Sequence, residues 1–112
     1  MDLREKRRYS RVKLKSPLHF NIRGRGDFSD TVSEDISAGG ICFTNNQYIA
    51  PLTNLMLELK LLSRVLNAIG RVVWVNPLAH SDRYRMGVEF VELDPQKKLY
   101  LSEYILMQEN IL

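Results

Sequence analysis

The sequence predicts a small all-β domain, either an antiparallel barrel or a sandwich, that ends in a single helix. Between residues 12 and 93, about six segments show either a two-residue alternation of apolar and polar side chains or a short apolar run, and both patterns are typical of strands. Short polar turns separate these segments, and none of them has the spacing of an amphipathic helix. The 112 residues are enough for one domain with one hydrophobic core.

The first predicted strand covers residues 12–22. Its apolar side chains fall on alternate positions and are expected to face the core: Val12, Leu14, Leu18, Phe20 and Ile22. Pro17 has no N–H group for a ladder hydrogen bond, so it predicts a strand edge or a bulge at this point. Residues 24–27, Gly-Arg-Gly-Asp, predict the turn that follows.

The second predicted strand covers residues 28–36. Its apolar residues Phe28, Val32 and Ile36 are expected to point inward. Polar residues at the odd positions share the opposite face: Thr31, Ser33, Asp35 and Ser37. Asp35 and Ser37 are therefore expected to point to solvent, or to a ligand that lies on the outer surface of the sheet.

Four further strands are predicted within residues 41–44, 55–61, 66–75 and 83–93. The third of these is an almost unbroken apolar run that ends at Asn76-Pro77. In residues 55–61 and 83–93, apolar residues alternate with polar ones, and two sets are expected to face inward: the leucines at 55, 57, 59 and 61, and Tyr84, Met86, Val88 and Phe90.

A helix is predicted from about residue 95 to residue 110. Asp94 is a good N-cap residue, and Pro95 suits the first helical position. The segment that follows has neither Gly nor Pro. Its apolar side chains cover a wide arc, so the helix is expected to cap the β domain and to keep some apolar surface for a partner chain.

The charge is concentrated near the N-terminus. Residues 1–25 contain nine Lys or Arg and two acids, whereas residues 26–112 contain seven Lys or Arg and eleven acids. Residues 1–11 are interpreted as a flexible basic arm and residues 12–112 as the folded domain. A basic arm favours an anionic partner such as phosphate, nucleic acid, lipid headgroups or an acidic protein, although it could also be a solvated tail.

Other features of the composition indicate a cytoplasmic protein. No apolar run approaches the ~20 residues that span a bilayer, so membrane insertion is not expected. The charged N-terminus is unlike a signal peptide. Cys42 is the single cysteine, which suits a reducing compartment. The sequence contains no nucleophile–base set, metal cluster or phosphate loop, so we expect neither an enzyme nor a cofactor.

Two short motifs carry the chemistry that the sequence suggests. Arg7 and Arg11 are separated by three residues, with Arg8 between them as a plausible accessory contact. Arginine donates two hydrogen bonds to guanine O6 and N7, stacks on bases and pairs with phosphate. In the second motif, Asp35 could accept from the N1–H and N2–H groups of guanine, while Ser37 and Gly40 could hold a phosphate. Each motif alone could also be an ordinary basic tail or an ordinary turn.

Together the motifs resemble the PilZ domain family, whose signature is R-x-x-x-R followed by [D/N]-x-S-x-x-G. Residues 70–75, Gly-Arg-Val-Val-Trp-Val, and residues 84–90, Tyr-Arg-Met-Gly-Val-Glu-Phe, resemble its last two strands. The resemblance implies a six-stranded antiparallel β-barrel with a C-terminal helix that binds cyclic di-GMP. It also implies ligand-binding roles for five positions: Arg7, Arg11, Asp35, Ser37 and Gly40.

The resemblance further implies a signalling mechanism. The arm is expected to close over the nucleotide, and a downstream protein of a motility, adhesion or polysaccharide machinery would read the change. Lys6, just before the first arginine, bears on whether one or two nucleotides bind. Trp74 either stacks on a purine or is buried in the core. Two alternatives remain open: a small barrel that binds oligonucleotides, and a PilZ-like interaction module without nucleotide binding.

Overall fold

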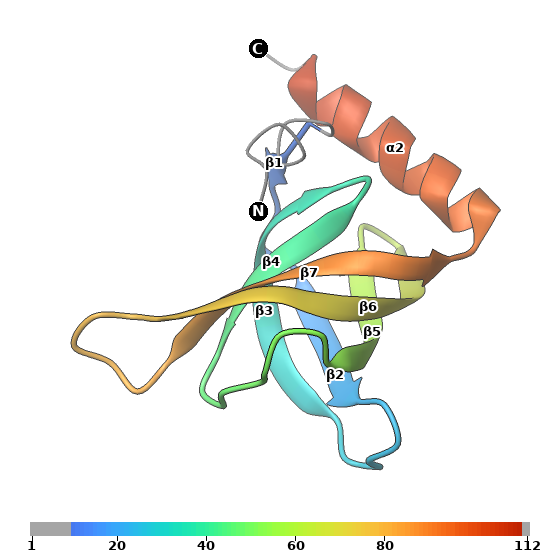
Figure 1. Ribbon diagram of the computed structural model, residues 1–112. Coiled ribbons are helices and arrows are strands. Elements are labelled where there is room, and N and C mark those ends of the chain that lie inside the picture. Colours follow the sequence, from blue (N-terminus) through green and yellow to red (C-terminus); the bar gives the residue numbers. More distant parts are fainter. Residues whose placement is uncertain (1–9, 111–112) are drawn as a thin grey trace.

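The fold was determined as a computed structural model, which describes residues 10–110. These residues form seven strands followed by one helix (Figure 1). Their bounds are β1 Val12–Lys13, β2 Pro17–Ile22, β3 Ser29–Ser37, β4 Gly40–Asn45, β5 Asn54–Leu61, β6 Arg64–Pro77, β7 Tyr84–Leu93 and α2 Pro95–Glu109.

The strands from β2 to β7 form a closed antiparallel barrel. Their order is β3-β2-β5-β6-β7-β4, and β4 pairs again with β3 to close the ring. The predicted six-stranded antiparallel barrel with a C-terminal helix is therefore confirmed. The strand β1 is a two-residue addition that pairs with the end of β3, where Val12 lies opposite Ile36.

The predicted first strand is split into β1 and β2 before Pro17. Residues 14–16 leave the regular ladder, and Ser33 bridges the break from β3. The Ser33 hydroxyl donates to the Leu14 carbonyl oxygen and accepts from the Ser16 N–H at 3.1 Å. Because Pro17 lacks an N–H group, it fits the start of a strand better than its interior.

The barrel interior is filled by apolar side chains from every strand. The alternation predicted for β5 is confirmed, because Leu55, Leu57, Leu59 and Leu61 are all buried. Phe20 of β2 and Phe43 of β4 pack together, with their ring centroids 5.1 Å apart. A ligand must therefore bind on the outside of this barrel or at its ends.

The helix α2 lies across the end of the barrel where β1 is found (Figure 1). The Asp94 side chain accepts a hydrogen bond from the Gln96 N–H at 2.8 Å, which confirms the predicted N-cap. Leu101, Tyr104 and Ile105 join the core of the barrel. Within residues 10–110, no helix is both long enough and apolar enough to cross a membrane.

The predicted register of β3 is wrong in its first half. Phe28, just before the strand, and Val32 are 47% and 51% exposed, whereas Ser33 is buried. The cause is a β-bulge: Ser33 lies opposite Phe43 and Asp35 lies opposite Cys42, so that Glu34 is an extra residue. One inserted residue reverses the alternation, so odd positions face inward before the bulge and Ile36 faces inward after it.

Candidate functional site

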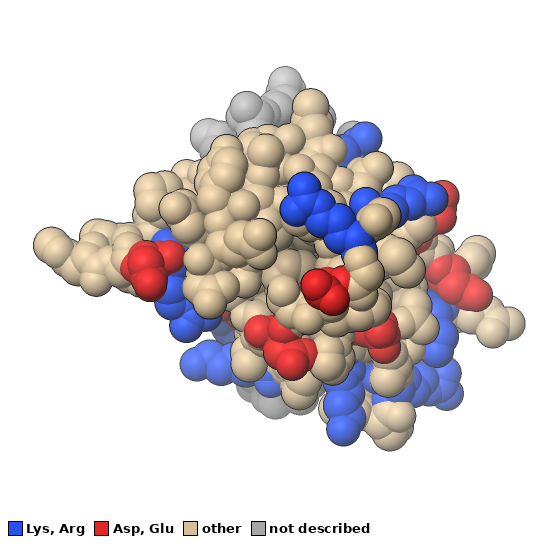
Figure 2. Space-filling view, turned by 90° about the horizontal axis from the view of Figure 1, so that it is seen from below, with Lys and Arg blue, Asp and Glu red and all other residues tan. Residues whose placement is uncertain are grey.

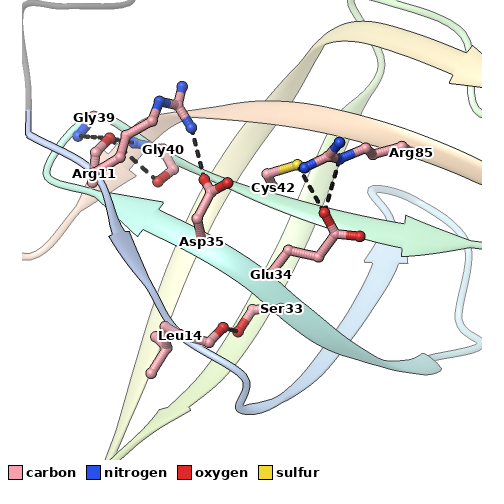
Figure 3. A network of polar contacts seen from close by, with 10 residues as sticks. Arg11, Leu14, Ser33, Glu34, Asp35, Gly39, Gly40, Cys42 and Arg85 are labelled. Atoms are coloured by element: carbon pink, nitrogen blue, oxygen red, sulfur yellow. Dashed lines mark hydrogen bonds and ion pairs between the residues drawn. The ribbon is translucent and has the colours of Figure 1, made fainter.

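The bulge in β3 places two carboxylates side by side on the outer face of the barrel. Glu34 and Asp35 point to one side of the strand, while Ser33 and Leu14 lie on the other (Figure 3). Without the extra residue, consecutive side chains of a strand would point to opposite faces. The bulge therefore presents Asp35 outward while Ser33 and Ile36 on either side remain buried.

A second bulge, in β6, turns Trp74 to the outer face of the barrel. Val72 lies opposite Val88 and Trp74 lies opposite Gly87, so that Val73 is the extra residue. Val72 is fully buried in the core, but Trp74 is half-buried and lies outside the core cluster. Of the two alternatives for Trp74, burial in the core is therefore wrong.

Gly87 provides the surface on which the Trp74 indole rests. A Cβ atom at position 87 would lie 2.2 Å from Trp74 Nε1 and 2.4 Å from Cε2, closer than atoms can approach. The ring is therefore in contact with the backbone of β7. Any side chain at this position would push the indole away from the barrel.

One cross-strand pair connects the two bulges. Cys42 of β4 lies opposite Gly87 of β7, so Asp35, Cys42, Gly87 and Trp74 form a continuous row across four strands. We call these four residues the Asp35–Trp74 row. Three strand spacings separate its ends, which is about 14 Å between backbones. The row has a carboxylate at one end, an indole at the other, and two small residues between them.

Arg11 lies directly over the carboxylate end of the row. Its Nη1 donates to Asp35 Oδ1 at 2.8 Å (Figure 3). The short pairing of β1 with β3, in which Lys13 lies opposite Asp35, brings the arginine there. The two sequence motifs therefore meet at this ion pair. Arg7 and Arg8, together with Lys6, lie outside the described residues.

Ser37 and Gly40 form the tight turn between β3 and β4. Ser37 is only 3% exposed, so the expectation that it points to solvent is wrong. Its hydroxyl accepts from the N–H groups of Gly39 at 3.1 Å and Gly40 at 3.2 Å, which caps the turn. A Cβ on Gly40 would lie 2.2 Å from the Val88 carbonyl oxygen. Both residues fix the shape of the turn beside Asp35.

Sequence reasoning missed a second ion pair that flanks the row. Arg85 Nε donates to Glu34 Oε2 at 2.8 Å, and Thr44 Oγ1 donates to Glu34 Oε1 at 2.6 Å. Glu34 and Arg85 lie beside Cys42, which is buried (Figure 3). Burial raises the pKa of the Cys42 thiol above 9.0, and the nearby carboxylates of Asp35 and Glu34 add to the rise against the opposing effect of Arg85.

Gly87 was also missed, although the sequence contained a signal for it. A glycine inside a strand often marks a close approach to the backbone, and Gly87 stands within the apolar alternation of β7. The bulges had no such signal. Among residues 10–110, no three His, Cys, Asp or Glu side chains are grouped so that they could hold a metal ion.

Comparisons with known proteins agree with this architecture. The family model of the PilZ domain matches residues 5–107. The structure of the Bacillus subtilis inhibitor of motility, MotI/DgrA, has a TM-score of 0.80 at 19% identity over 91% of this chain and 50% of its own. Comparison with curated protein sequences finds no match.

Two other similar structures are described as complexes with c-di-GMP. The PilZ domain of YcgR from Escherichia coli has a TM-score of 0.72 at 13% identity, over 93% of this chain and 92% of its own. The MrkH complex from K. pneumonia has a TM-score of 0.69 at 18% identity, over 89% and 49%. This chain thus spans about half the length of MotI/DgrA and MrkH. Because the family model matches most of its residues, the chain belongs to the PilZ domain family.

Proposed function

We propose that this protein is a receptor for cyclic di-GMP, which binds on the outer face of the barrel along the Asp35–Trp74 row. The observation that supports this most strongly is the meeting of both sequence motifs at one place, where Arg11 pairs with Asp35 at 2.8 Å. Family membership supports the same ligand, since YcgR and MrkH are both described with c-di-GMP.

The groups at the row match the groups of the ligand. A carboxylate such as that of Asp35 accepts from the N1–H and N2–H groups of guanine. The guanidinium of Arg11 donates to O6 and N7 or pairs with a phosphate. The exposed side of the Trp74 indole offers a surface for stacking, which is worth about 1–3 kcal/mol per base. Ser37 and Gly40 hold the turn that positions Asp35.

The proposed switch is the basic arm, residues 1–11. The ligand carries two phosphates, and the arm carries Arg7, Arg8 and Arg11. Binding would recruit these arginines, fix the arm over the nucleotide and change the surface near β1 that a partner protein recognises. We place this receptor in the cytoplasm, where the single thiol of Cys42 would stay reduced.

The surface charge does not favour the oligonucleotide-binding alternative. That function requires a groove lined with Lys and Arg along a sheet. Figure 2 shows the end of the barrel opposite α2, where basic and acidic side chains are intermixed. Around the row, Arg85 pairs with Glu34 and Arg71 pairs with Glu89 at 2.7 Å. These pairs leave the arm as the main source of unbalanced positive charge.

Isothermal titration calorimetry with cyclic di-GMP and cyclic di-AMP tests the proposal. Cyclic di-GMP should bind, and cyclic di-AMP should bind far more weakly, because adenine presents a donor where guanine O6 accepts. Asp35→Ala should reduce the affinity while the domain stays folded. The matched control is Asp30→Ala, an exposed carboxylate on the same strand. Equal affinity for the two nucleotides would contradict the readout of guanine, and heat from single-stranded RNA alone would favour the oligonucleotide alternative.

A further inference from the structure

An open groove of about 590 Å³ lies on the outer face of the barrel, away from the Asp35–Trp74 row. Its floor is formed by β5, β6 and β7, where Met56 lies opposite Ile69 and Ile69 lies opposite Glu92. Phe28 closes one side. Phe28, Met56 and Val91 are 47%, 44% and 47% exposed, so three large apolar side chains meet water in one place. Such a concentration of exposed apolar surface indicates an interaction site.

A third β-bulge shapes the edge of this apolar surface. Ile69 pairs with Glu92 and Gly70 pairs with Phe90, so that Val91 is an extra residue of β7. Val91 follows the inward-facing Phe90 and therefore faces outward by ordinary alternation, whereas the bulge turns Glu92 outward beside it and Leu93 towards the core. The bulge therefore places an exposed apolar side chain and an exposed carboxylate next to each other on the outer face.

The rim of the groove is acidic. Among the described residues that line it, three are acids, Glu58, Glu92 and Asp94, and none is Lys, Arg or His. The nearest outward basic residue along β6 is Arg71, which is paired with Glu89. Anionic lipid headgroups, nucleic acid and free phosphate are all repelled by such a rim. A cationic partner with an apolar face matches both the charge and the floor.

The floor itself favours a helix over an added strand. All eight residues of β5 pair with β6, and β6 pairs with β7 as far as Ala68 and Leu93. The backbone groups of these strands are therefore engaged within the sheet, and a partner must make its contacts through side chains. An amphipathic helix does this by laying one apolar face into a groove.

We infer that the groove is a docking site for an amphipathic helix of a partner protein, with apolar residues on one face and Lys or Arg beside them. The strands β6 and β7 run directly from the Asp35–Trp74 row to this groove, so one pair of strands carries both sites. The meaning of the groove for signalling rests on the proposed function, but its occupation by a helix does not.

The test uses the full chain labelled with ¹⁵N and a synthetic helical peptide of about four turns, with Leu on one face and Lys on the other. Saturable binding is expected to shift the amide signals of residues 56–58, 67–69 and 91–94. Two control peptides are titrated in the same way, one with Glu in place of Lys and one with Ser in place of Leu. Neither should bind at the groove, because the first is repelled and the second has no apolar face.

Substitutions of exposed residues then distinguish binding at the groove from non-specific attraction between the peptide and the charged protein surface. Glu92→Lys and Val91→Ser should each weaken binding of the Leu/Lys peptide by about tenfold, the scale for loss of a charge or apolar contact at an interface. Glu103→Lys, an equal charge change on the exposed side of α2, should leave the affinity unchanged. Equal binding of the Leu/Glu peptide, an equal loss in Glu103→Lys, or signal shifts confined to α2 would overturn the inference.

Two further measurements keep this inference apart from the nucleotide proposal. Titration of the peptide without nucleotide tests the groove alone, whereas calorimetry with cyclic di-GMP tests the receptor function alone.

Sedimentation of the free chain is measured over the same concentrations. Self-association that Val91→Ser abolishes would show that a second copy of this chain fills the groove, and would also overturn the proposed occupant.

Discussion

The contact between Arg11 and Asp35 is the centre of the proposed recognition site on the outer face of the barrel. An ionised carboxylate accepts about four hydrogen bonds, so the 2.8 Å bond from Arg11 leaves capacity for the edge of a guanine. Arg11 is 41% exposed and Asp35 is 17% exposed. An ion pair with this exposure contributes little to folding, at most about 1 kcal/mol. In the proposed function, this pair holds both groups in place for the nucleotide.

Arg11→Ala should therefore affect ligand binding much more than stability. We predict a loss of about 1–3 kcal/mol in the binding of cyclic di-GMP, the scale of a bidentate contact to a base. The melting temperature of the free protein should barely change. Calorimetry and thermal unfolding measure the two effects, with Arg23→Ala, another exposed arginine near the N-terminus, as the control. If Arg11→Ala kept full affinity, Arg11 would be only part of a solvated tail.

Cys42 gives a prediction about pH. Its pKa in the folded protein is raised above 9.0, chiefly because the thiol is buried. The folded state thus favours the neutral thiol. The stability that depends on the neutral thiol is fully present below about pH 9, the pKa expected for the unfolded chain. It is lost as the pH rises through the higher pKa of the folded state.

The free energy of unfolding of the wild type should therefore fall faster above about pH 9 than that of Cys42→Ala, which lacks the thiol. Urea unfolding of both proteins from about pH 7 to about pH 10.5, a range that spans the ordinary pKa of a cysteine thiol, measures this difference. Tyrosine and lysine residues titrate equally in the two proteins, so they cancel in the comparison. If the free energies of unfolding of the two proteins changed in parallel with pH, the pKa of Cys42 would be the same in the folded and the unfolded chain, which would contradict this prediction.

The strands are the elements that carry the site, and their bulges decide which residues it contains. The bulge at Glu34 sends Asp35 outward, and the bulge at Val73 sends Trp74 outward. Both bulges meet the same Cys42–Gly87 pair. Asp35 and Trp74 would not share the outer face in regular strands of the same length, because Trp74 would share the inward face of Val72.

Gly40 gives a prediction at this scale, because it joins the turn of the second motif to β7. Gly40→Ala should lower the free energy of unfolding by about 1–3 kcal/mol, the usual cost of forcing an extra methyl group into a packed site. The new Cβ would lie 2.2 Å from the Val88 carbonyl oxygen. Gly26→Ala is the control, since its Cβ would meet nothing within 4 Å. Urea unfolding compares the two, and equal stabilities would show that the turn has room for a side chain.

Much of this structure was predictable from the sequence, because hydrophobic alternation reports which face of a strand is buried. The leucines of β5 and the capped helix after Asp94 follow their patterns. The bulges were not predictable, because a single inserted residue does not change the composition of a strand. It nevertheless moves every later side chain of that strand to the opposite face. Sequence reasoning therefore placed Asp35 on the outer face, where the structure has it, but left Trp74 open and assigned Phe28 and Val32 to the wrong face.

On the scale of the whole molecule, the important feature is the separation of charge. Residues 1–25 carry a net charge of +7 and residues 26–112 a net charge of −4. The sequence of residues 1–11 combines like charges with few apolar anchors, a composition that predicts little intrinsic order. An anion bound at the row would attract the positive charge of the arm.

We therefore predict from the sequence that the arm becomes ordered only with ligand. Hydrogen exchange at residues 3–11 should be fast in the free protein and slow with cyclic di-GMP. Ordering costs roughly 1–2 kcal/mol per backbone residue, which charged contacts must offset, so the affinity should also fall as salt is added. Strong protection in the free protein would indicate a preformed site and would exclude closure of the arm as the switch.

The central claim is that cyclic di-GMP binds on the outer face between Asp35 and Trp74, and the fluorescence of Trp74 tests it most directly. Trp74 is the single tryptophan of the chain, so its emission reports on this one place. Titration with cyclic di-GMP should change the emission in a saturable way, and the change should be lost in Asp35→Ala, at the other end of the row. An emission that stays constant while calorimetry shows binding would place the nucleotide elsewhere and contradict this account.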